Sequence, residues 1–106
     1  MKNHEKIEQR SLLMAQAIVA KIDEDPNHAG LKKAQQVCRR WADPRNETVI
    51  QEWLHILAQP WESIRKILLS PSEESRRLRQ SSPFCGILSP QERWTLYKAF
   101  SNSETN

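Results

Sequence analysis

Apolar residues recur at three- and four-residue intervals along most of the chain, the spacing that places them on one face of an α-helix. The first such segment predicts a helix over residues 6–23. Its apolar stripe consists of Leu12, Ala15, Val19 and Ile22. Pro26 follows this segment and disfavours helical geometry at the residue before it. A second helix is predicted over residues 28–42, with Asn27 as its N-cap.

Prolines divide the rest of the chain into shorter segments. Pro44 interrupts the second helix, and a third helix is expected to begin at Asn46 or Thr48 and to end at Gln59. Pro60 suits the first turn of a fourth helix, because a proline there removes no intrahelical hydrogen-bond donor. Both helices carry apolar residues at helical spacing, so each is expected to pack one face into a core.

A capping signal occurs twice, as SPSE at residues 70–73 and SPQE at residues 89–92. In each copy the serine is expected to cap the helix, the proline to occupy its first position and the glutamate to complete a capping box. The two copies predict a fifth helix over residues 71–80 and a sixth over residues 90–100. The sixth is expected to direct four side chains toward the core, namely Trp94, Leu96, Tyr97 and Phe100.

The segment between these two helices, SSPFCGILS at residues 81–89, is too apolar to be a free loop. Phe84, Ile87 and Leu88 are expected to fold back onto the body of the protein. Gly86 is expected to allow the turn a backbone conformation that a side chain would resist.

Composition supports a small helical domain. The chain has 106 residues, enough for one continuous core, and its two glycines are too few for the turns of a β-rich fold. Hydrophobic residues make up 38%, below the roughly 45–50% of an average domain, which indicates flexible ends. We therefore predict an all-α single domain over residues 1–106, a compact bundle of five or six short helices, with its ordered core at about residues 7–100.

The two cysteines, Cys38 and Cys85, do not form the framework of a small secreted domain, so a cytoplasmic location is predicted. One alternative comes from LLMAQAIVA at residues 12–20, which has the composition of a signal-peptide core. Gln16 interrupts that run, and the same residues make a good helix face. The run is also too short to cross a bilayer, so no membrane association is predicted.

No catalytic or metal-binding motif is present. The sequence has neither a glycine-rich phosphate loop nor a clustered Cys-His spacing. Glu52 and His55 have the Glu-x-x-His spacing of di-iron bundles, but such sites need a second copy that the sequence lacks. No base accompanies Cys38 or Cys85 in sequence to activate the thiol. We therefore predict no enzyme, no cofactor and no metal site.

Positive charge is concentrated near the C-terminus. Residues 76–98 carry five basic side chains and one carboxylate, a net charge of +4 against +3 for the whole chain. Such a patch is typical of nucleic-acid binding or of docking to an acidic protein surface. It is equally compatible with the solvated face of a short helix. A convincing helix-turn-helix, which would favour specific DNA binding, is not found.

The C-terminal run LRQSSPFCGILSPQERW resembles a block, LRQ-SPF-G-LSP-ERW, found in a group of small, helical, mostly uncharacterised bacterial proteins. RSLLMAQAIVAKI and IQEWLHIL are similar to the first and central helices of that group, so the resemblance spans about residues 10–100. Members occur in bacterial toxin and antitoxin gene pairs. The resemblance thus implies an antitoxin-like protein that binds a protein partner such as a cognate toxin. Cys85 departs from it, because a small residue such as alanine is expected there.

These observations lead to one main hypothesis, a non-enzymatic protein-interaction module that uses the arginine-rich SSPFCG loop region. The predicted partner-binding or loop-positioning residues are Arg76, Arg79, Gln80, Ser82, Phe84 and Arg93. A structural alternative is that Arg79 and Arg93 fasten the loop by binding its carbonyl groups, with Phe84 as a core residue. The alternative function is a small basic transcriptional regulator that binds nucleic acid.

Overall fold

The structure, a computed structural model, describes residues 2–43 and 47–105, with side chains for residues 8–43 and 47–101. The described residues form six helices and no strand, which confirms the predicted all-α bundle. The helices are α1 (Lys2–Glu24), α2 (Ala29–Ala42), α3 (Thr48–Leu57), α4 (Trp61–Leu69), α5 (Glu73–Arg79) and α6 (Pro90–Thr105). Pro44 and Asn46 lie outside the described residues.

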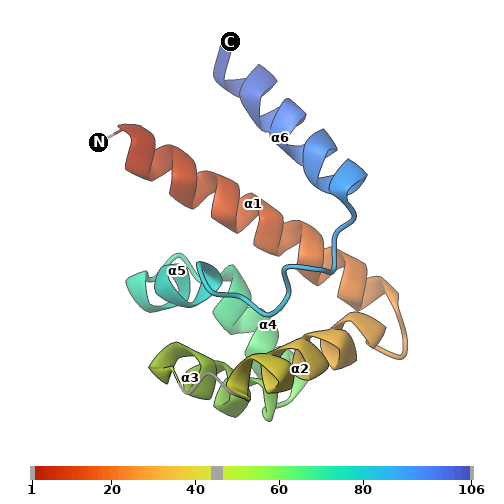
Figure 1. Cartoon of the computed structure of the whole chain (residues 1–106). Coiled ribbons are helices and arrows are strands. Elements are labelled where there is room, and N and C mark those ends of the chain that lie inside the picture. Colours follow the sequence, from red (N-terminus) through yellow and green to blue (C-terminus); the bar gives the residue numbers. More distant parts are fainter. Residues whose placement is uncertain (1, 44–46, 106) are drawn as a thin grey trace.

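The first helix is the common packing partner in the bundle. α1 contacts α2, α4, α5 and α6, while α2 packs on α3 and α4 packs on α3 and α5. α6 runs back along α1 in the opposite direction, so that both chain ends lie at the same end of the molecule (Figure 1). The main helix contact of α6 is with α1. Within the described part of the chain, no helix combines the length and apolarity needed to cross a bilayer.

The apolar core gathers side chains from the helices and from the loop at residues 81–89. Its largest fully buried members are Trp53, Phe84, Ile22, Ile64, Leu68, Pro83 and Cys38. Trp53 and Phe84 meet edge to face, with ring centroids 6.0 Å apart, an arrangement that aromatic pairs favour. The indole Nε1 of Trp53 donates a hydrogen bond to the carbonyl oxygen of Leu78 at 3.0 Å, so its buried polar group is satisfied.

The second helix is capped differently from the prediction. The carboxylate of Asp25 accepts hydrogen bonds from the backbone amides of Asn27 at 3.0 Å and Ala29 at 2.9 Å. These hydrogen bonds lower the pKa of Asp25. Asn27 is not the N-cap, because His28 holds that position in the left-handed conformation, with φ 49°. An aspartate in a turn readily accepts bonds from the amides that follow it, and here Asp25 does so.

The two predicted capping signals differ in outcome. At the start of α6, Ser89 Oγ accepts from the Glu92 amide at 3.1 Å and Glu92 Oε1 accepts from the Ser89 amide at 2.8 Å, so the capping box is confirmed. At α5 the prediction was wrong by two residues. The N-cap there is Ser72, which accepts from the amide of Ser75, and Ser70 Oγ instead accepts from the Ser72 amide. α6 also continues to Thr105, beyond the predicted end at residue 100.

The two glycines have unexpected roles. Gly86 has no positive φ, and a Cβ placed there would meet only Lys33, at 3.8 Å, so the predicted conformational role of Gly86 was wrong. At Gly30 in α2, a Cβ would lie 2.7 Å from Ile22 Cγ1. Gly30 is therefore the glycine that the fold needs, because it lets the first turn of α2 approach the end of α1.

Candidate functional site

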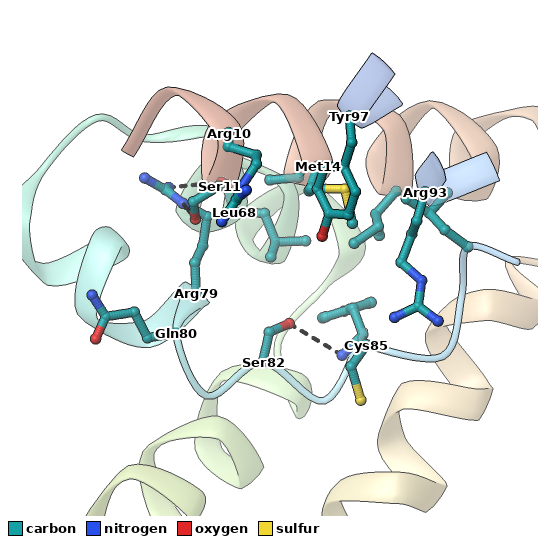
Figure 2. Close-up of a pocket in the computed structure, with 14 residues that line it drawn as sticks. Arg10, Ser11, Met14, Leu68, Arg79, Gln80, Ser82, Cys85, Arg93 and Tyr97 are labelled. Carbon is teal, nitrogen blue, oxygen red and sulfur yellow. Dashed lines mark hydrogen bonds between the residues drawn. The ribbon is translucent and has the colours of Figure 1, made fainter. Parts of the chain in front are cut away.

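A cavity of about 430 Å³ opens between α1, α6 and the segment that runs from the end of α4 to Leu88 (Figure 2). Its apolar lining comes from Met14, Ala15, Ile18, Leu68, Phe84 and Leu88. The fold positions this lining because α1 and α4 pack against each other. Five of these six side chains are buried at the base of the cavity, and Met14 is partly exposed.

The polar part of the lining is basic and neutral. It consists of Arg10, Ser11, Arg79, Gln80, Ser82, Cys85, Arg93 and Tyr97. Neither an aspartate nor a glutamate is among the fourteen residues that line the cavity. Three guanidinium groups therefore face one cavity without a carboxylate in its walls, and the field inside it favours an anion.

One of these arginines is part of the framework. Arg79 donates from Nη1 to the carbonyl oxygens of Leu68 at 3.0 Å and Ser70 at 2.7 Å, and from Nε to Ser11 Oγ at 3.2 Å. Burial, together with the nearby charge of Arg76, lowers the pKa of Arg79. Arg79 thus joins the end of α4 to α1 and satisfies carbonyl groups that the helix end leaves free. It does not bind carbonyls of the 81–89 loop.

The other two arginines remain available. The guanidinium carbon of Arg10 lies 5.1 Å from the ring centroid of Tyr97, a cation–π contact. The guanidinium group of Arg93 makes no hydrogen bond or ion pair with the part of the chain that the structure describes. Figure 2 shows Arg10 and Arg93 on opposite sides of Tyr97, with the tyrosine hydroxyl directed into the cavity.

The loop that forms the lower wall is fixed in place. Pro83 and Phe84 are fully buried, and Ile87 and Leu88 are buried as well. Ser82 Oγ accepts a hydrogen bond from the Phe84 amide at 3.1 Å. The exposed tip is formed by Cys85 and Gly86. At this tip, Lys33 Nζ donates to the Gly86 carbonyl at 3.2 Å.

The concentrated positive charge of residues 76–98 is partly compensated in the fold, because two of its five basic side chains pair with carboxylates. Arg76 pairs with Glu8 of α1, and Arg77 pairs with Glu74 and, at 2.5 Å, with Glu52 of α3. These carboxylates raise the pKa of Arg77. Glu8 and Glu52 are distant in sequence, so a local charge count misses them. The basic surface that remains is smaller than the sequence indicates.

Five of the six predicted site residues line the cavity, namely Arg79, Gln80, Ser82, Phe84 and Arg93. Arg76 lies apart from it and is held by Glu8, with its Nε buried and without a partner among the described atoms. The prediction missed Arg10 and Tyr97. Tyr97 had been assigned to the core and is half-buried. Arg10 lies four positions before Met14, so helical spacing places the two on the same side of α1.

Trp94 is the exception among the tryptophans. Its side chain is 63% exposed, and it is the one large hydrophobic residue that is exposed in the described part of the chain. The prediction that Trp94 faces the core was therefore wrong. Tyr97 lies three positions further along α6, so the two side chains are neighbours on the helix surface. Trp94 thus flanks the cavity without lining it.

Glu52 and His55 lie apart from the cavity. Both residues border a shallow hollow between α3, α4 and α5, of about 800 Å³. Glu52 is engaged by Arg77 there. Among the residues that the structure describes, no three His, Cys, Asp or Glu side chains are grouped so that they could hold a metal ion.

Comparison of the chain with protein-family models, curated proteins and solved structures finds no match. The structural features that bear on function are therefore the cavity, the fixed loop and the exposed tryptophan.

Proposed function

We propose that this chain is a non-enzymatic, antitoxin-like interaction module that binds a protein partner through the loop at residues 81–89 and the adjoining turns of α6. The observation that carries the proposal is the exposed indole of Trp94. A tryptophan exposes a large apolar area to water, and tryptophan and arginine dominate the energetics of protein interfaces. Burial of this indole against a partner would remove that area from water.

The charges around Trp94 favour an acidic partner surface. Arg93 precedes it, and exposed Lys98 lies one helical turn after it. The nearest carboxylate in sequence, that of Glu92, is already bound to Lys21. Complementary negative charge on the partner would therefore speed association and fix its orientation.

The fixed loop supports the same proposal. Phe84 anchors it in the core, and Lys33 holds its tip. A loop that is ordered before binding loses less conformational entropy on association than a flexible one. The block that resembles the antitoxin-like group covers this loop and the start of α6.

The nucleic-acid alternative has less support, because Arg76 and Arg77 are paired with carboxylates. Phosphate binding would have to displace these ion pairs. A regulator of this kind would bind duplex DNA with an affinity that falls steeply with salt. A chain that captures no DNA at low salt would exclude this alternative.

The test is copurification of the full chain from the organism that encodes it, followed by binding measurements with the recovered partner. We expect a stoichiometric complex, and we expect Trp94→Ala to weaken it by about 30-fold or more, the loss typical of an interface hot spot. Arg40→Ala on the exposed side of α2 is the control and should leave the affinity unchanged. A chain that stays free of any partner, or a complex that is unaffected by Trp94→Ala, would refute the proposal.

A further inference from the structure

The cavity beside Trp94 has the features of a small-molecule site in its own right. Its volume of about 430 Å³ falls within the range of ligand pockets, roughly 300–1,000 Å³. Such pockets combine a mostly apolar lining with a few polar groups that orient the ligand. Here the apolar side chains come from α1, α4 and the loop, and the charged groups come from α1, α5 and α6.

The apolar part indicates what the body of a ligand would be. Met14 and Leu68 meet Phe84 and Leu88 around the interior, and none of them carries a hydrogen-bonding side chain. A polar molecule would lose its bonds to water there without replacement. The interior therefore suits an alkyl or aryl group.

The charged part indicates what the head group would be. Arg79 is occupied by two carbonyl oxygens and a hydroxyl group. Among the described residues, the guanidinium group of Arg93 has no hydrogen-bond or ion-pair partner, and that of Arg10 has only the ring contact with Tyr97. Guanidinium groups bind carboxylates and phosphates through charge-assisted hydrogen bonds. Because no aspartate or glutamate lines the cavity, Arg10 and Arg93 are free to bind an anion from solution.

From these features we infer that the cavity binds a small amphipathic anion, an apolar chain with a single carboxylate or phosphate head group. The apolar chain lies against the partly exposed Met14, and the head group lies at the opening, between Arg10 and Arg93 and near the Tyr97 hydroxyl (Figure 2). The inference does not depend on the protein partner, because Trp94 does not line the cavity.

The test uses calorimetric titration of the full chain with sodium octanoate, octyl phosphate and 1-octanol at low salt, below their micelle concentrations. We expect one anion to bind per chain, at least about 10-fold more tightly than the alcohol, since bonds to a charged group outweigh those to a neutral one. The difference in affinity between octanoate and octyl phosphate shows which head group the cavity prefers. Equal binding of anion and alcohol, or binding of none of the three, would overturn the inference.

Variants locate the site. Arg93→Gln and Arg10→Gln should each weaken binding of the anion by about 10- to 100-fold and leave 1-octanol unaffected. Arg40→Gln, an exposed arginine of α2 outside the cavity, is the matched control and should bind like the wild type. Arg93 has no partner in the described chain, so its replacement should leave the fold intact. Wild-type affinity in both cavity variants would refute the assignment.

Discussion

Lys21 and Glu92 connect the end of α1 to the first turn of α6, with Lys21 Nζ 2.7 Å from Glu92 Oε1. The same ammonium group donates to the Ile87 carbonyl at 3.0 Å. The same carboxylate oxygen accepts from the Ser89 amide. One ion pair therefore fixes α1, the loop and α6 together, and these are the three elements that frame the cavity.

This arrangement makes stability depend on pH. The hydrogen bond from Lys21, together with that from the Ser89 amide, lowers the pKa of Glu92 from 4.5 to about 2. A carboxyl group with a lowered folded-state pKa stabilises the native state fully above its unfolded pKa, and this contribution is lost as the pH falls toward the folded value. Glu92→Gln should therefore flatten the fall in melting temperature between pH 4.5 and pH 2.

Glu62→Gln is the control for this measurement. Glu62 also lies in the first turn of a helix, α4, but its exposed side chain has no ion pair among the described residues. The two variants therefore share any effect of the helix dipole. If both change the pH profile of the melting temperature equally, the Lys21 contact is not the cause.

The contact between Gly30 and Ile22 gives a second prediction. Gly30→Ala should destabilise the protein by about 1–3 kcal/mol, the usual cost of overpacking a core, although alanine is the better helix former. The added Cβ would lie 2.7 Å from the buried side chain of Ile22. Urea unfolding measures this cost. Gly86→Ala is the matched control, with an expected change below about 0.5 kcal/mol because the nearest atom is the flexible end of Lys33.

The helices could be predicted from the sequence because their signals are local. Apolar spacing located the first four helices, and the two Ser-Pro capping signals located α5 and α6. The capping box of Ser89 and Glu92 depends on residues only three positions apart. The burial of Phe84 followed from the apolar character of its loop. By contrast, the N-cap of α5 depended on which of two serines, Ser70 or Ser72, the chain would use. Both are possible caps by residue type.

The candidate site could be predicted only in part, because its remaining residues come together through packing. The loop and the start of α6 are close in sequence, so a local reading grouped Gln80, Ser82 and Arg93. The opposite wall comes from α1, and Arg10 meets Tyr97 only because α6 folds back along that helix. The exposure of Trp94 arises likewise, since α6 has its main contact with one helix alone.

Phe84 is expected to anchor the loop at residues 81–89 in the core. Phe84→Ala should lower the free energy of unfolding by about 3–5 kcal/mol, because it removes a fully buried ring that packs against Trp53 and Trp61. Cys85→Ala changes the exposed neighbour and should cost less than about 0.5 kcal/mol. Denaturant unfolding of the two variants compares them. Similar costs would mean that the loop is not anchored through the ring.

Arg79 is expected to stabilise the folded protein. Arg79→Lys should cost about 1–3 kcal/mol, because one ammonium group cannot reproduce the separate bonds to Leu68, Ser70 and Ser11. Thermal or urea unfolding measures the change. Arg39→Lys on the exposed surface of α2 provides the comparison and should be neutral. A neutral Arg79→Lys would show that its carbonyl contacts contribute little.

The two cysteines should differ in reactivity because they differ in burial. The Cys38 side chain is fully buried, with Sγ 3.8 Å from the Ile50 carbonyl oxygen, and burial raises the pKa of its thiol. Cys85 is exposed at the loop tip. Because the thiolate must form and be reached by the reagent, DTNB should label one thiol rapidly in the native protein and the second only on unfolding. Cys85→Ser should abolish the rapid phase and Cys38→Ser should retain it. Two rapid phases in the native wild type would mean that the α2–α3 core around Cys38 opens readily.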